Sequence, residues 1–376
     1  ACVRRLGSDG MSQTHFVHLA EAFLRGRLDV ERDKAPWLTE LVPSNGRYYV
    51  VYPPMPAMLL MPLVAVWGTR VRSWAFSITL AVVCVGLTYG LLRRTGATRQ
   101  VSTWATILFG FGTTFWYTSL PGSSWYLAHV VGVLFLLLAS LEAYGHKRPF
   151  LIGLLVGAAA LSRLPIVLAT PFFCYVDLLG ERAVLRKLAL LLSGVGLWLG
   201  LNMLYNWARY GTVFDVGYYR IPGVLQEAWY QQGIFDLSYL PRNVYALLFQ
   251  APVLTGTFPY IVPTTFGLSL FFTTPAFLLM FLAPGTRATW ALAAAALLVA
   301  LPTLLHGWPG ATQFGYRFSL DYTPFLVLLT AAGMRGTVSG RAKALVVLSC
   351  LVSLWGLGFA RWIAPPQWLF PMEPSL

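Results

Sequence analysis

The stretch 73-SWAFSITLAVVCVGLTYGLL-92 decides the class of fold, because it is apolar along nearly its whole length and carries no charge. A helix of about 20 apolar residues crosses the hydrocarbon core of a bilayer. Similar runs fill the chain, which is 57% hydrophobic and 11% charged, with a mean hydropathy of +0.64. Soluble domains carry about 25% charged residues. The runs do not alternate between polar and apolar residues, so they predict helices and not a barrel.

The sequence predicts an all-α polytopic membrane protein with about ten spans. The predicted spans are 73–92, 101–119, 125–144, 150–162, 165–179, 186–207, 264–283, 289–306, 322–334 and 343–361. This pattern divides the chain into a first outer loop, a transmembrane block, a second outer loop, a second transmembrane block and an outer tail. Their bounds are 1–72, 73–208, 209–263, 264–361 and 362–376.

The basic residues lie in alternate loops and predict which side each loop faces. Twelve belong to one set: Arg93, Arg94, Arg99, Lys147, Arg148, Arg182, Arg186, Lys187, Arg287, Arg335, Arg341 and Lys343. The opposite short loops hold only Arg163 and Arg317. Cytoplasmic loops are rich in Lys and Arg, so the twelve are placed in the cytoplasm. The net charge of +13 therefore follows membrane topology and does not indicate nucleic-acid binding.

The same assignment places the acidic residues. Of the fourteen, only Glu142, Asp177 and Glu181 fall near the cytoplasmic side. Catalytic groups, if the protein is an enzyme, are therefore expected on the extracytoplasmic side. The break at Arg163 must also face outward, which requires two half-depth helices on either side of it.

The first outer loop carries the first candidates. Residues 11–25 predict an amphipathic interfacial helix, and 57–68 a second interfacial or re-entrant helix. Asp9 precedes the first helix, where its carboxylate can take part in catalysis, cap the N-terminus of the helix, or do both. His15 and His18 are three residues apart on this helix and are candidates for binding substrate. With Glu21 they could bind a divalent metal ion, for which His18 and Glu21 are the candidate ligands; a plain polar face is the alternative. The chain begins at Ala1, and we expect an upstream span.

The segment that follows is rich in Tyr and Pro, which predicts extended backbone. Arg47, Tyr48, Tyr49 and Tyr52 can present a cation, hydroxyls and ring faces to a sugar or phosphate. Anchoring at the membrane interface is the alternative.

Further candidates lie at the outer ends of the predicted spans. His129 lies just inside a span, where a histidine needs a partner and is a functional candidate or a satisfied structural residue. Arg163 lies beside free helix ends and suits a phosphate, or extends outward to the interface. Arg317 and Asp321 are four residues apart and either pair with each other or bind an anionic lipid phosphate together. Arg220, in the second outer loop, is a further candidate cation.

The order of the motifs resembles the GT-C superfamily of membrane glycosyltransferases, in particular the family 39-like enzymes related to protein O-mannosyltransferases and the lipid A aminoarabinose transferase. The motifs are SDG (8–10), LRGRLD (24–29), RYYVVYPPMPAMLLMP (47–62), LSRLP (161–165), YNWARYGTVFDVGY (205–218), GLSLFFTTP (267–275) and FGYRFSLDYTPF (314–325). The resemblance covers essentially the whole chain.

The resemblance implies a GT-C-type bundle in a bacterial inner membrane with its active side extracytoplasmic. It implies a polyprenyl-phosphate-linked sugar as donor, a glycan, lipid or protein as acceptor, and Asp9 as catalytic base. The arginines then stabilise the leaving phosphate, a task that a metal ion can share. The alternative is a non-catalytic membrane subunit, alone or in a larger complex, or a lipid or polysaccharide carrier built on the same scaffold.

Overall fold

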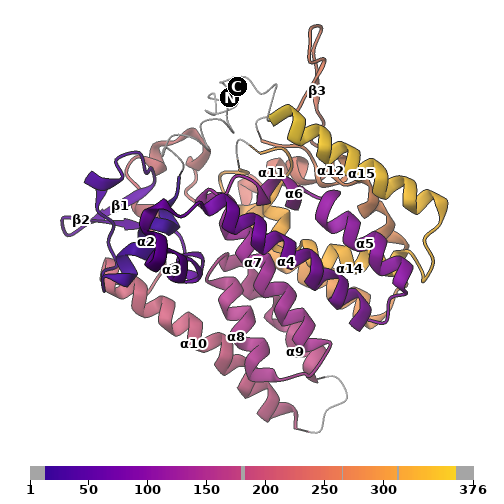
Figure 1. Cartoon of the computed structure of the whole chain (residues 1–376), viewed down its shortest axis with the longest axis horizontal. Coiled ribbons are helices and arrows are strands. Elements are labelled where there is room, and N and C mark those ends of the chain that lie inside the picture. The colour runs from indigo at the N-terminus through magenta and orange to yellow at the C-terminus, as the bar shows by residue number, and fades with distance from the viewer. Residues whose placement is uncertain (1–12, 179–182, 265, 311–312, 361–376) are drawn as a thin grey trace.

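The computed structural model describes residues 13–178, 183–264, 266–310 and 313–360, and within them the chain is mostly helical (Figure 1). Five of the described helices are long and apolar enough to cross a membrane. They are α4 (Ser73–Arg94), α7 (Ser124–Ala143), α10 (Val184–Tyr210), α13 (Arg287–Leu305) and α15 (Gly340–Gly358). The prediction of a helical membrane protein is confirmed at this level.

The other predicted spans form shorter or broken helices. They comprise α5 (Arg99–Phe111), α6 (Thr114–Ser119), α8 (Pro149–Ala160), η3 (Leu164–Ala169), α9 (Thr170–Leu178), α12 (Leu270–Thr273), the 3-10 segment η8 (Pro275–Leu282) and α14 (Thr323–Gly333). The predicted span 101–119 breaks before α6, where the Thr113 hydroxyl accepts the Phe115 amide and starts a new helix. The predicted span 264–283 is not one α-helix, because the chain is interrupted at Thr274 and continues as a 3-10 helix from Pro275. The predicted break around Arg163 is present, since Arg163 is extended between α8 and η3.

Small residues let two of the helices approach closely. Gly153 on α8 and Gly194 on α10 face the backbone of the opposite helix, and a methyl group at either position would collide with a carbonyl oxygen of that helix. Close backbone approach through small residues is a common way to pack helices in membranes. This contact fixes α8 and therefore the position of Arg163 just beyond its end.

Four of the basic loops, or the helix ends that lead into them, meet at one end of the bundle. The Arg94 guanidinium donates to the Leu141 carbonyl at 2.6 Å, and the Arg335 guanidinium donates to that of Leu282 at 3.1 Å. The Thr98 hydroxyl donates to the Gly336 carbonyl at 2.7 Å. These contacts agree with grouping the loops by charge, while their side of the membrane stays a prediction.

The first outer loop contains both helices and a hairpin. Its elements are α2 (His15–Leu24), η1 (Arg32–Lys34), β1 (Leu41–Ser44), β2 (Arg47–Val50), α3 (Met55–Trp67) and η2 (Gly68–Arg70). The predicted helix 11–25 begins only at His15, because Gln13 and Thr14 are not helical. β1 and β2 pair antiparallel through an Asn45-Gly46 turn with positive φ at both residues, and β2 begins the segment for which the sequence predicts extended backbone.

The second outer loop consists mainly of short 3-10 turns. It contains η4 (Tyr218–Arg220), η5 (Val224–Gln226), η6 (Ala228–Tyr230), η7 (Leu237–Tyr239), α11 (Leu240–Leu248) and the paired strands β3 (Val253–Leu254) and β4 (Ile261–Val262). The last short helix, η9 (Arg317–Asp321), leads into α14.

Candidate functional site

The first residues of α7 form the centre of the candidate site. Ser124, Trp125, Tyr126 and His129 contact three segments that are distant in sequence. Ser124 contacts α2, and Trp125 contacts Glu40, the residue before β1. Tyr126 and His129 contact the two ends of η9. We call this group of contacts the α7 cluster.

The most buried part of the α7 cluster joins His129, Asp321 and Arg163. His129 Nδ1 lies 2.8 Å from Asp321 Oδ1, and Arg163 Nε donates to both carboxylate oxygens at 3.2 and 3.1 Å. The side chains of His129 and Asp321 are fully buried. Each of the three residues comes from a different segment, so the carboxylate fixes the relative positions of α7, the α8–η3 break and η9.

This geometry sets the hydrogen-bonding state of His129. A carboxylate accepts hydrogen bonds, so Nδ1 carries the proton that faces Asp321 and Nε2 of the neutral ring is an acceptor. Nε2 is buried and has no hydrogen-bond partner among the described residues. The ring therefore presents an open acceptor within the α7 cluster.

The expected pairing of Arg317 with Asp321 is wrong, because Asp321 binds Arg163 and His129 instead. The Arg317 guanidinium carbon lies 5.3 Å from the centre of the Tyr126 ring and 5.4 Å from that of Phe318. Arg163 lies 5.2 Å from the same Phe318 ring. The two predicted phosphate-binding arginines therefore both contact the Phe318 ring.

Glu40 is a site residue that sequence reasoning did not single out. Its carboxylate accepts the Trp125 indole N–H at 3.0 Å and the Tyr52 hydroxyl. Its φ of 55° lies in the left-handed region, which costs energy for a residue other than glycine and is common at functional positions. Burial first, and the Glu40 carboxylate second, hold the pKa of Tyr52 well above its usual range.

The second outer loop reaches the same place through Tyr218. Burial and then the nearby Glu40 carboxylate raise the pKa of Tyr218, while Arg317 and Arg163 act in the opposite direction. Burial and then Glu40 also raise the pKa of Glu227. Tyr218 therefore lies within electrostatic reach of an acid and of both arginines.

His15 supports the α7 cluster from α2. Its Nε2 donates to the Thr39 carbonyl at 2.6 Å, its Nδ1 lies 3.2 Å from the Ser124 hydroxyl, and its ring lies edge-on to Tyr52. Burial lowers the pKa of His15 to about 4, so the ring is neutral at pH 7. Both ring nitrogens of His15 therefore have a hydrogen-bond partner. The partner of Nε2, Thr39, directly precedes Glu40.

The other residues of the predicted metal face point elsewhere. His18 lies edge-on to Trp37, and Glu21 pairs with Arg25 at 2.7 Å. No group of three His, Cys, Asp or Glu side chains suited to a metal ion occurs among the described residues.

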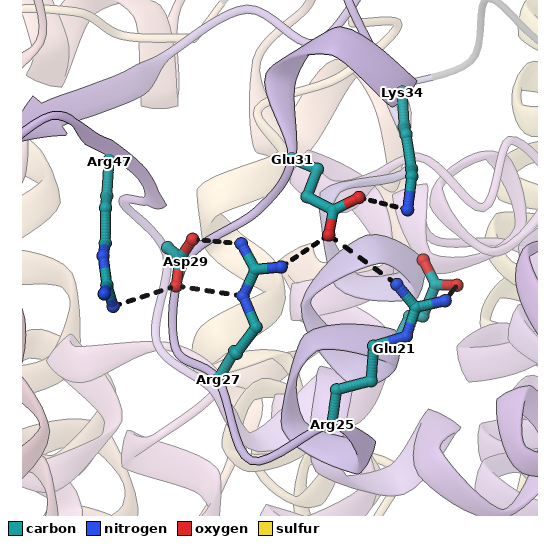
Figure 2. Close-up of polar contacts among 7 residues, drawn as sticks. All are labelled: Glu21, Arg25, Arg27, Asp29, Glu31, Lys34 and Arg47. Atoms are coloured by element: carbon teal, nitrogen blue, oxygen red, sulfur yellow. Dashed lines mark hydrogen bonds and ion pairs between the residues drawn. The ribbon is translucent and has the colours of Figure 1, made fainter.

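An ion-pair network covers the outer surface of this loop (Figure 2). Arg27 bridges Asp29 and Glu31, each at 2.5 Å, and Glu31 also pairs with Lys34. Arg47 lies 3.6 Å from Asp29 at the edge of this network. Arg47 therefore belongs to the ion-pair network of residues 25–34 and not to the α7 cluster.

Three more predicted substrate-binding residues also lie away from the α7 cluster. Tyr48 lies under the Arg32 guanidinium, and the buried Tyr49 ring packs edge-on against Tyr210. Arg220 donates to the Tyr210 carbonyl at 3.1 Å. Tyr49 therefore joins the first outer loop to the end of α10, and Arg220 joins the second outer loop to the same end, while Tyr48 packs within the first outer loop.

Asp9, the predicted catalytic base, lies outside the described residues. The structure therefore brings together Tyr52, His129, Arg163, Arg317 and Asp321 from the predicted set, with His15 in support, and it adds Glu40 and Tyr218. No protein-family model, curated protein or solved structure matches this chain.

Proposed function

We propose that this protein is a GT-C-type glycosyltransferase that takes a sugar from a polyprenyl-phosphate donor and transfers it to an acceptor hydroxyl. One observation carries the proposal. The first two turns of α7 contact a carboxylate, Glu40, and a guanidinium group, Arg317, and reach a second guanidinium group, Arg163, through His129 and Asp321. Acid and cations together at the end of a helix able to cross a membrane suit a reaction between a lipid phosphate ester and a polar acceptor.

The chemistry requires both kinds of group. A carboxylate base removes the proton of the acceptor hydroxyl as its oxygen attacks the anomeric carbon. The bond from that carbon to the phosphate oxygen breaks, and the lipid phosphate leaves with its electron pair. A guanidinium near the leaving oxygen stabilises the developing charge. Arg163 is engaged by Asp321, and the proposal assigns the phosphate to Arg317, which lies against Tyr126 in the first turn of α7.

The base is assigned to the first outer loop, with Glu40 and Asp9 as its two candidates. Glu40 is held by Trp125 and Tyr52, as a base that must be kept in position would be. The proposal retains about ten spans, with α5–α6 and α8–α9 as broken or half-depth passages, an extracytoplasmic active side and a bacterial inner membrane. It includes no required metal ion, and its acceptor is a glycan, lipid or protein.

The test is a transfer assay with purified protein in nanodiscs and a series of polyprenyl-phosphate sugars. Glu40→Gln and Asp9→Asn, which change no side-chain size, are compared with Asp33→Asn, a substitution at an exposed acid of the same loop. We expect transfer by the wild type and Asp33→Asn, and a loss of at least 100-fold in one of the other two, with folding retained. Full transfer by both variants would remove the base assignment. Absence of transfer by the wild type across donors, with lipid bound, would favour a carrier or a non-catalytic subunit.

A further inference from the structure

A hairpin in the second outer loop projects from the rest of the chain. It comprises residues 251–263, with β3 and β4 as its strands (Figure 1). Its large side chains are turned outward, with Leu254 78%, Phe258 72% and Tyr260 59% exposed. We call this segment the apolar hairpin.

The apolar hairpin lies in a long region without charge. The chain has no Asp, Glu, Lys, Arg or His between Arg242 and His306 except Arg287. Exposed apolar side chains in such number mark an interaction surface. A protein partner would usually be selected by charges around an apolar centre, and the apolar hairpin offers none.

The backbone of the apolar hairpin is suited to a medium with little water. Its strands pair Val253 with Val262 and Leu254 with Ile261. At the tip, the Thr255 amide donates to the Tyr260 carbonyl at 2.8 Å and the Tyr260 amide to that of Thr257 at 2.9 Å. Pro252, Pro259 and Pro263 have no amide hydrogen to leave unpaired. Unpaired backbone groups are what exclude most loops from lipid.

The position of the apolar hairpin also points to lipid. Its base is closed by the Ser269 amide, which donates to the Gln250 carbonyl at 2.8 Å at the start of α12. Leu268, just beyond the hairpin, pairs with Phe314, whose ring packs edge-on against Trp355 near the end of α15, one of the five helices able to cross a membrane. The end of such a helix lies at the level of the headgroups, where aromatic side chains accumulate.

We propose that the apolar hairpin inserts its tip into the lipid headgroup region and upper acyl chains, in the leaflet nearest the α7 cluster. The connection to the α7 cluster is short. Leu268, just beyond the hairpin, pairs through its amide with the Phe314 carbonyl at 2.9 Å and through its carbonyl with the Tyr316 amide at 3.1 Å. Arg317 follows Tyr316 directly, so this pairing joins the segment at the base of the apolar hairpin to the segment that carries Arg317.

The test places an environment-sensitive fluorescent amino acid at residue 258 of the full chain in phosphatidylcholine–phosphatidylglycerol vesicles. We expect a blue-shifted emission and at least threefold stronger quenching by lipids with a shallow doxyl label than for the same probe at Gln226, an exposed position of the same outer loop. Tyr260→Asp should weaken the quenching at residue 258. A water-like emission that doxyl lipids do not quench would overturn the proposal. A photo-crosslinker at residue 258 that forms one discrete protein adduct in native membranes, and no lipid adduct, would also overturn it.

Discussion

Replacing Asp321 by Asn removes one charge from the most buried ion pair of the protein and leaves the shape of the side chain unchanged. The Asp321 side chain is 0% exposed and that of Arg163 only 23% exposed. Removing one partner of a buried ion pair costs about 3–5 kcal/mol, because the other charge stays buried without compensation. Asn can still accept a hydrogen bond from Arg163 Nε, so we expect about 3 kcal/mol, the lower end of that range.

The free energy of unfolding can be measured in mixed detergent micelles for Asp321→Asn, Arg163→Gln and the double variant. We expect each single variant to be destabilised, and the double variant to be more stable than the sum predicts by at least about 1 kcal/mol. Asp33→Asn, at an exposed acid of the first outer loop, should stay within about 0.5 kcal/mol of the wild type. Unchanged stability in Asp321→Asn, or strict additivity in the double variant, would refute the pairing described for Asp321.

Two further predictions concern the supports of the α7 cluster. The pKa of His15 falls from 6.5 to about 4 on folding, so the unfolded chain binds the proton first and stability should decrease as the pH falls from 6.5 to 4. At about 1.4 kcal/mol per pKa unit, His15 contributes about 3 kcal/mol to that decrease in the free energy of unfolding. His15→Gln should therefore flatten the measured pH dependence of unfolding by that amount. An identical pH profile in the variant would contradict the burial of His15. Gly194→Ala should lower the stability and yield of folded protein, because the new methyl group meets the backbone of α8. The matched Gly196→Ala on the same helix meets open space and should be neutral or slightly stabilising. Equal thermal stability of the two variants would mean that the α8–α10 contact is looser than described.

Much of the helical structure could be predicted from the sequence, because apolar length is a local property. The predicted spans 125–144 and 289–306 lie within two residues of α7 and α13 at each end. The break at Arg163 was found from charge and from the proline that follows it. The interruption of 264–283 was not, because an apolar composition does not distinguish an α-helix from the 3-10 segment that follows Thr274.

The α7 cluster was predictable only in part, because its contacts connect distant residues. His129 and Asp321 are 192 residues apart, and Glu40 and Trp125 are 85 apart. The pairing of Arg317 with Asp321 was expected from α-helical spacing, but these residues form a 3-10 helix, in which positions three apart align and positions four apart do not. Glu40 carried one weak signal, its place as the last acid before the Tyr-Pro segment, after Asp29, Glu31 and Asp33.

The central claim, that the α7 cluster receives a lipid phosphate, is tested most directly by the binding of undecaprenyl monophosphate to the purified protein, measured by native mass spectrometry. The account predicts saturable binding that Arg317→Gln weakens at least tenfold, and markedly weaker binding of undecaprenol, which lacks the phosphate. Equal binding of the phosphate and the alcohol, or binding unaffected by Arg317→Gln, would contradict it.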